Sequence, residues 1–392
     1  MPLALYLLAM AVFAMGTSEF MLAGLLPDIA SDLDVTVGTA GTLTSAFAMG
    51  MIVGAPLMAV LARNWPARSS LLGFVLVFLA SHAMGAATSN FPVLFATRVV
   101  AALANAGFLA VAMTTAAALV LPDKRGRALA VLLSGTTVAT IAGVPGGAVL
   151  GTLLGWRATF WAVAALCLPA AIGVLTGIPA RPVEADESEG PTLRAELAQL
   201  KSPRLLLVML LGASVNAATF ASFTFLAPVV TDTAGLGELW VSVALVLFGV
   251  GSFVGVTAAG RLSDQRPGLV LAVGGPLLLI GWLALALLAD KPVALLALVF
   301  AQGALSFALG STLITRVLYE AAGAPTMAGS YATAALNVGA ALGPLIAATT
   351  LRSTVGDLGP LWTSGLLVTV ALLIAFPLRT VVADGRSTEV LQ

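Results

Sequence analysis

The sequence carries very little charge. Only 9% of its 392 residues are Asp, Glu, Lys or Arg, while 59% are hydrophobic, whereas about a quarter of the residues in soluble domains are charged. Its 18 basic and 18 acidic residues balance, so the chain lacks the basic excess with which proteins bind nucleic acid. The composition predicts an integral membrane protein whose surroundings are the lipid bilayer.

Cysteine and histidine are also scarce. Cys167 is the only cysteine, so no disulfide can form within the chain, and its apolar surroundings predict a small packing residue. His82 is the only histidine and has no acidic neighbour at helical spacing, so we expect a hydrogen-bonded packing residue; the alternative is a residue that touches the proton path. The sequence offers no ligand cluster for a metal and no phosphate-binding loop. It also lacks the clustered histidine or carboxylate groups near one interface that a membrane enzyme would need. We therefore expect neither an enzyme nor a protein with a cofactor.

Long apolar runs are abundant. Each has about twenty residues or more, enough to cross a bilayer as a helix. Six precede a long polar segment and six follow it: 3–26, 39–61, 70–88, 92–120, 128–153 and 159–178, then 205–230, 239–262, 269–289, 293–318, 326–350 and 361–382. This pattern predicts a six-helix bundle over 1–178, a cytoplasmic linker over 179–204, and a second bundle with a short cytoplasmic tail over 205–392.

The positions of Lys and Arg predict the orientation, because cytoplasmic loops retain these residues. Fourteen lie in loops on the side of the termini and the linker, three lie on the other side, and one, Arg98, lies within a helix. We therefore expect both termini in the cytoplasm of a multi-pass protein of the inner (cytoplasmic) membrane.

One carboxylate, Glu19, lies inside the first apolar run. A charge in a spanning helix costs at least about 2.5 kcal/mol, so such a residue normally faces the protein interior and has a function. The run ends at Leu26, and we expect Pro27 and Asp28 to end the helix at the outer water interface.

Arg98 in the fourth run is the natural partner of Glu19. Counted from the outer ends of their helices, both lie seven residues inside, about 10 Å deep at about 1.5 Å per residue. Burial opposes ionisation of a carboxyl and a nearby guanidinium favours it, so changing exposure can load and release a proton. Arg98 stays charged and sets the acidity of Glu19. The alternative is a buried pair that only fixes helix one against helix four.

The chain contains an internal repeat, as transporters often do. The loop Ala59–Pro66 follows the second helix of its half, and Gly260–Pro267 follows the second helix of the other half. Gly143–Gly147 in helix five has a similar counterpart, Gly339–Pro344, in helix eleven.

These segments resemble the major facilitator superfamily, and within it the twelve-helix drug:proton antiporters. Gly260–Arg266 is similar to the superfamily's loop signature, Gly339–Pro344 to an antiporter motif, and Arg98 occupies the place of a buried arginine in helix four. Four first-half segments resemble the chloramphenicol exporters of actinomycetes and their sugar-efflux relatives: Thr17–Phe20, Gly24–Ala30, Gly54–Leu57 and Gly155–Phe160.

The resemblance implies an all-α membrane protein with twelve transmembrane helices in two pseudo-symmetric six-helix bundles, the major facilitator fold. It implies a monomer that couples protons to efflux of a small neutral drug, chloramphenicol, and thereby confers resistance. The alternative is a same-fold exporter of a sugar or another small apolar compound.

The resemblance also implies site residues. Asp264 would gate transport together with Arg261 and Arg266, although Asp264 can equally cap helix nine. The first-half loop has Arg63 and Pro66 where the superfamily has aspartate and glycine, so the gating contact is not carried over there. The antiporter motifs comprise Gly143, Pro145, Gly147, Gly339, Gly343 and Pro344, which either seal the cavity or only let helices pack closely.

The neutral polar residues in the apolar runs are few. Asn105, Asn216, Gln302 and Asn337 are the candidates to orient a cargo in a largely apolar cavity. Such a cavity suits a neutral, moderately apolar molecule better than an anion.

Overall fold

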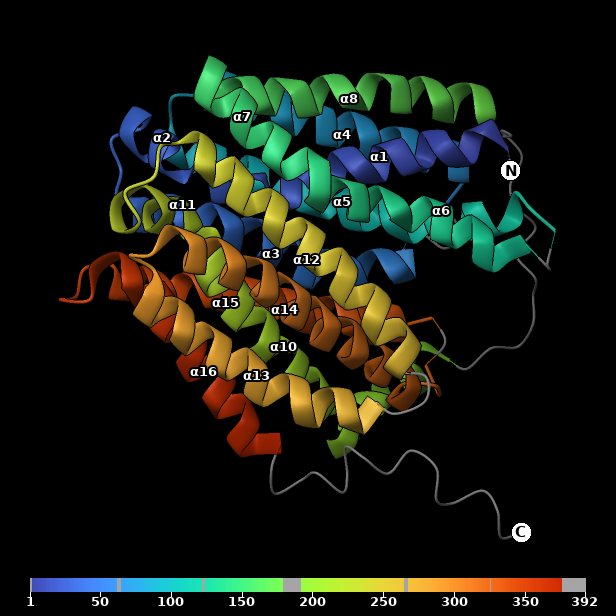
Figure 1. Cartoon of the computed structure of the whole chain (residues 1–392). Coiled ribbons are helices and arrows are strands. Elements are labelled where there is room, and N and C mark those ends of the chain that lie inside the picture. Colours follow the sequence, from blue (N-terminus) through green and yellow to red (C-terminus); the bar gives the residue numbers. More distant parts are fainter. Residues whose placement is uncertain are drawn as a thin grey trace, which may run out of the picture.

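The computed structural model describes residues 2–61, 65–121, 124–178, 192–263, 267–324 and 326–375. Within these ranges all regular structure is helical (Figure 1). Twelve helical segments are long and apolar enough to cross a bilayer, which confirms the predicted number.

Among the described residues, ten helical elements precede the linker. They are α1 (Leu3–Phe20), the 3-10 turn η1 (Met21–Gly24), α2 (Leu26–Asp32), α3 (Val37–Leu61), α4 (Ala67–Ala87), α5 (Phe91–Ala118), α6 (Arg125–Val138), the π turn η4 (Ala139–Gly143), α7 (Val144–Leu154) and α8 (Trp156–Gly177).

The first of the remaining elements, α9, begins within the predicted linker, and the others follow it. They are α9 (Leu193–Ala198), η5 (Gln199–Lys201), α10 (Pro203–Thr224), α11 (Leu226–Pro228), the π turn η6 (Val229–Thr233), α12 (Leu239–Ser263), α13 (Pro267–Leu288), α14 (Pro292–Glu320), α15 (Ala328–Thr350), η7 (Gly356–Leu358) and α16 (Gly359–Ala375).

The first helix does not end where the sequence predicted. The α-helix stops at Phe20, and Pro27 and Asp28 lie inside the next helix, α2. Pro27 is at the first turn of α2, where a missing N–H costs nothing because that N–H has no intrahelical partner. The expectation that Pro27 and Asp28 end a helix was therefore wrong: they begin one.

Corresponding helices in the two halves pack alike. A Cβ atom on Gly50 of α3 would lie 2.7 Å from the carbonyl oxygen of Val99 in α5, and one on Gly251 of α12 would overlap the carbonyl oxygen of Phe300 in α14. The two glycines are 201 residues apart, as are the two residues that they approach. This common spacing relates α3 and α5 to α12 and α14.

The two halves touch along α3 and α15 and where α12 passes α7 (Figure 1). The hydroxyl of Ser45 donates to the carbonyl of Ala341 at 2.7 Å. Near the start of α3, a Cβ on Gly38 would lie 3.4 Å from that of Ala348. We call this end of the molecule, where α2 is joined to α3, the Asp32 end, and the end that carries α9 the Lys201 end.

At the Lys201 end, α9 is fixed to the start of α15. The buried carboxylate of Glu196 accepts the backbone N–H groups of Thr326 and Met327 at 3.1 and 2.9 Å. The hydroxyl of Tyr331 donates to the carbonyl of Glu196 at 3.0 Å. A carboxylate from the predicted linker thus caps a helix 130 residues later in the chain.

Candidate functional site

Arg98 is buried in α5, with 1% of its surface exposed. Its two terminal nitrogens donate to the hydroxyl and the backbone carbonyl of Ser18, at 2.7 and 2.8 Å. The guanidinium also lies 4.6 Å from the ring centre of Phe47 in α3. Three helices therefore hold this cation, and none of these contacts is to a carboxylate.

His82 of α4 completes the arrangement. Its Nδ1 is 2.8 Å from the carbonyl of Phe78, and its Nε2 is 2.7 Å from the hydroxyl of Ser18. A carbonyl can only accept, so Nδ1 carries the ring hydrogen and Nε2 accepts from Ser18. Ser18 accepts from Arg98 and donates to His82. We call these three residues the Ser18 network.

Glu19 follows Ser18 directly and is half-buried. It forms no hydrogen bond or ion pair with any residue that the structure describes. The Nε of Arg98 is likewise without a hydrogen-bond partner among the described residues. The contact of Arg98 with the residue before Glu19 agrees with the predicted common depth of the two charges. The carboxyl is thus near the cation but not paired with it.

Aromatic rings surround Phe20, the residue after Glu19. Its ring centre is 5.6 Å from that of Phe220 and 6.1 Å from that of Phe223, both in α10. Phe223 in turn lies 4.7 Å from Phe248 of α12. The two halves therefore meet beside Glu19 through apolar aromatic surface.

No hydrogen bond joins any two of the four neutral polar candidates. The side-chain amide of Asn105 donates weakly to the sulfur of Met51 in α3. The other three amides donate to backbone carbonyls: Asn216 to Leu336, Gln302 to Leu278 and Asn337 to Thr333.

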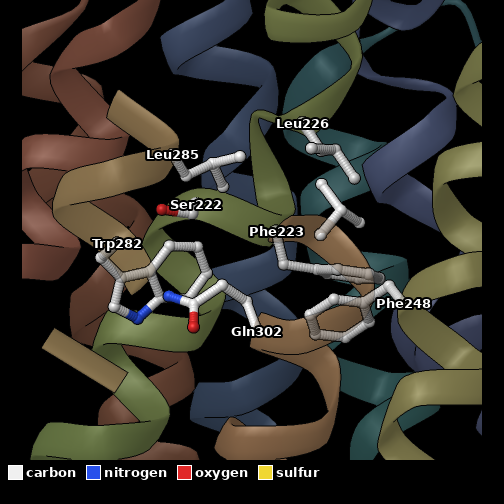
Figure 2. Close-up of a pocket in the computed structure, with 8 residues that line it drawn as sticks. Ser222, Phe223, Leu226, Phe248, Trp282, Leu285 and Gln302 are labelled. Carbon is white, nitrogen blue, oxygen red and sulfur yellow. The ribbon is translucent and has the colours of Figure 1, made fainter. Parts of the chain in front are cut away.

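Gln302 lines a small pocket inside the second half (Figure 2). The cavity has a volume of about 10 Å³, which is about the minimum that a single water molecule needs. Its walls come from α10, α11, α12, α13 and α14: Ser222, Phe223, Leu226, Phe248, Trp282, Leu285, Val299 and Gln302. No pattern in the sequence distinguishes Trp282 from the other tryptophans.

The motif glycines lie at close helix contacts. A Cβ on Gly143 would overlap the hydroxyl of Thr17 in α1, and one on Gly339 or Gly343 would overlap backbone of α10. A Cβ on Gly147 would lie 3.0 Å from a side-chain carbon of Thr159. These contacts favour the interpretation that the glycines let helices approach closely.

The prolines of these motifs lie within the same helices. Pro145 is in the first turn of α7 and Pro344 is inside α15.

The predicted gating loop is only partly described. Asp264 and Arg266 lie outside the described residues, and only the backbone of Arg261, within α12, is described. Gating by these residues stays a prediction.

The sequence matches the Major Facilitator Superfamily over residues 8–344. The chain belongs to this superfamily. It is 81% identical over 389 residues to the chloramphenicol resistance protein of Streptomyces lividans, an alignment that covers 99% of each chain. It is 32% identical over 377 residues to the MFS-type transporter YtbD of Bacillus subtilis, covering 95% of this chain and 94% of that one.

The fold is also that of a solved superfamily structure. A bacterial homologue of the human lysosomal transporter Spinster, crystallised in an inward-facing, unoccupied conformation, superimposes with a TM-score of 0.79 at 16% identity, covering 99% of this chain and 98% of that one. The predicted major facilitator fold is confirmed, and the protein is a multi-pass membrane transporter.

Proposed function

We propose that this transporter exports chloramphenicol, a small neutral drug, in exchange for protons. The observation that carries the proposal is the 81% identity to a chloramphenicol resistance protein along nearly the whole chain. Chloramphenicol has an aromatic ring with hydroxyl and amide groups, so the aromatic surface of Phe20, Phe220 and Phe223 and a few neutral polar groups suit it.

Glu19 is the proposed proton carrier. It is half-buried and unpaired within the described chain, so its carboxyl is free to bind and release a proton. Arg98 remains charged and favours the carboxylate, whereas loss of water favours the protonated form. A change in exposure between two states therefore changes which effect prevails. Exchange of a neutral drug for one proton moves one net charge across the membrane. Each 100 mV of membrane potential therefore contributes about 2.3 kcal/mol of free energy to export.

The transporter is proposed to act as a monomer. Its two halves, residues 1–178 and 205–392, are proposed to move relative to each other about the site. The common spacing of 201 residues supports this division. The loop Gly260–Arg266 resembles the superfamily's gating loop, and we assign gating to Asp264 with Arg261 and Arg266.

The proposed location is the cytoplasmic membrane, with the Lys201 end inside. The distribution of Lys and Arg supports this orientation. In a Cys167→Ala background, Ser89→Cys and Gly237→Cys, both exposed at the Asp32 end, should react with an impermeant thiol reagent outside intact cells. Lys201→Cys should react only after the cells are opened, and the reverse pattern contradicts the orientation.

The export proposal is tested by measuring chloramphenicol in a sensitive, pump-depleted host. The wild type should lower the cellular drug concentration, and dissipating the proton gradient should abolish the difference. Glu19→Gln keeps the side-chain shape and removes the titration, so it should reach the membrane and bind the drug but fail to pump it.

Two results would contradict separate parts of this proposal. Normal pumping by Glu19→Gln would place proton coupling elsewhere. Unchanged drug accumulation with the wild type would reject chloramphenicol as cargo and leave the fold untouched.

A further inference from the structure

The internal repeat relates the proposed proton carrier to a phenylalanine. The spacing of 201 residues that relates α3 to α12 also makes Phe220 of α10 the equivalent of Glu19 in α1. Phe220 lies at the interface between the halves, since it packs with Ala48 of α3 and with Phe20. The position that carries a carboxyl in one half therefore carries an aromatic ring in the other.

The Ser18 network has no counterpart in the second half. The three equivalent positions hold one neutral polar and two apolar residues: Thr219, Leu283 and Val299. The hydroxyl of Thr219 donates within its own helix, to the carbonyl of Val215 at 2.9 Å. Beyond Arg204 at its start, α10 carries no charged residue, and α15 carries none. This part of the second half therefore suits a neutral group.

Asn216 adds a free hydrogen-bond acceptor beside Phe220. The two residues are four positions apart in α10, so they lie on the same face of the helix, about 6 Å apart along its axis. The side-chain nitrogen of Asn216 donates to the carbonyl of Leu336 in α15 at 2.7 Å. The amide oxygen therefore faces away from α15, and no donor in the described chain reaches it. Asn216 is partly exposed, whereas Asn105 and Gln302 are 1% and 0% exposed.

The ring of Phe220 already holds one aromatic group from the other half. The ring of Phe20 stacks on it, with ring centres 5.6 Å apart and planes at 30°, a geometry that aromatic pairs favour. Phe223 borders both rings edge-on, at 6.1 and 6.2 Å. Because Phe20 belongs to the first half and Phe220 to the second, separation of the halves would end this stack and uncover the face of Phe220.

We propose that Asn216 and Phe220 form the cargo-binding face of the second half. When the halves separate, an aromatic ring of a neutral cargo replaces the ring of Phe20 on Phe220, and a hydroxyl or amide N–H of the cargo donates to the amide oxygen of Asn216. The first half then binds the proton and the second half binds the cargo. The inference rests on the proposed export function.

Thiol protection tests where the cargo lies. In a Cys167→Ala background, purified full-length Asn216→Cys is treated with N-ethylmaleimide alone, with chloramphenicol, or with 4-nitrobenzyl alcohol, which offers an aromatic ring and one hydroxyl. A saturating probe should slow modification about tenfold, because few proteins then have a free site. Gly237→Cys, exposed at the Asp32 end, is the control and should react equally fast with and without either probe.

Affinities for radiolabelled chloramphenicol test the two contacts. Asn216→Leu should bind about tenfold more weakly than the wild type, and Phe220→Leu about fivefold more weakly. The control Ser214→Ala loses a hydroxyl that donates within α10, to Leu210 at 2.9 Å, and should bind like the wild type.

The pH dependence of binding separates the roles of the two halves. Asn216→Leu and Phe220→Leu should weaken binding and keep the wild-type pH dependence, because Glu19 is intact. Glu19→Gln should do the reverse, and bind the drug with little dependence on pH. A variant that only distorts the protein would change both properties.

The outcomes distinguish this subsite from the export proposal. Protection of Asn216→Cys by either probe supports the subsite, and protection by neither overturns it. Protection by 4-nitrobenzyl alcohol without binding of chloramphenicol rejects chloramphenicol as cargo and retains the subsite for another aromatic alcohol. An unchanged affinity in Asn216→Leu or Phe220→Leu overturns the contact assigned to that residue, and loss of the pH dependence in these variants overturns the division between the halves.

Discussion

At the scale of single residues, the main feature is that neutral groups hold Arg98. The Ser18 hydroxyl and carbonyl each accept one hydrogen bond from a terminal nitrogen of Arg98, and His82 fixes the Ser18 hydroxyl. An ion pair with Glu19 would hold that carboxylate ionised, because an opposite charge nearby stabilises the charged form. Holding the cation through Ser18 leaves Glu19 free to exchange protons.

We predict that Ser18→Ala and His82→Ala shift the pH dependence of drug export in the same direction. Each removes part of the network that fixes the guanidinium, so Arg98 can shift toward Glu19 and favour its ionised form. Export should then need a more acidic exterior. Because both residues act through one network, the double variant should resemble either single variant.

The matched control is Ser81→Ala. Ser81 is the neighbour of His82, and its hydroxyl donates only within α4, to Val77 at 2.8 Å. A change in total export with no change in its pH profile would show that the network is merely structural.

A second residue-scale prediction concerns Asp28, on α2 at the Asp32 end. Loss of surrounding water raises the pKa of its carboxyl, and the carboxylate of Glu238 raises it further. The folded state therefore binds this proton more tightly than the unfolded chain. Its contribution is fully present below the unfolded pKa of about 3.9 and is lost as pH rises through the raised folded pKa.

Unfolding of purified Asp28→Asn should accordingly depend less on pH across this acidic window than unfolding of the wild type. Asp290→Asn is the control, because Asp290 is an exposed carboxylate between α13 and α14. Equal pH dependence in Asp28→Asn and the wild type would show that neither burial nor Glu238 raises the pKa of Asp28 in the folded protein.

At the scale of elements, α9 does more than connect the two halves, because it is attached to the start of α15. Glu196 caps the backbone at the start of α15, and α15 is also the helix that meets α3 of the other half. The segment between the halves is thus mechanically joined to a helix at their interface.

We predict that Glu196→Ala lowers the free energy of unfolding by about 1–3 kcal/mol, since it leaves buried backbone N–H groups without their acceptor. Arg194→Ala on the exposed face of α9 should change it by no more than about 0.5 kcal/mol. Chemical denaturation in detergent measures both. Equal stability of the two variants would mean that α9 is not held through Glu196.

At the scale of the whole molecule, hydropathy was enough to predict the twelve spans, because each must be long and apolar to cross a bilayer. It also located Glu19 and Arg98, since charge is rare there. Hydropathy could not predict the Ser18 network. His82 and Arg98 lie 64 and 80 residues after Ser18, and hydropathy does not specify which helices become neighbours.

The sequence prediction failed for a similar reason at Pro27. Proline is compatible with the last turn before a loop and with the first turn of a helix, so Pro27 alone does not distinguish them. The cap that Glu196 forms could not be predicted from the sequence, because its contacts with Thr326 and Met327 join residues 130 and 131 positions apart.

The contact between the halves gives a whole-molecule prediction. Cβ atoms at Gly38 and Ala348 would be 3.4 Å apart, close to the 3.5–4.5 Å of a disulfide. In a Cys167→Ala background, Gly38→Cys with Ala348→Cys should cross-link on mild oxidation and stop drug export, because the Asp32 end can no longer separate. Export should return on reduction.

Each single cysteine variant should export drug with or without oxidant. A cross-linked transporter that still exports would show that α3 and α15 stay together throughout transport.

The separation of Ser18 from Arg98 in the sequence has a consequence for biosynthesis. The 80 residues between these partners take roughly 4–16 s to synthesise at 5–20 residues per second. During that interval α1 enters the membrane with Glu19 but without the cation that later lies beside it. An isolated carboxylate in hydrocarbon neutralises itself by taking up a proton. We therefore expect the carboxyl of Glu19 to enter the bilayer protonated, before Arg98 has been synthesised.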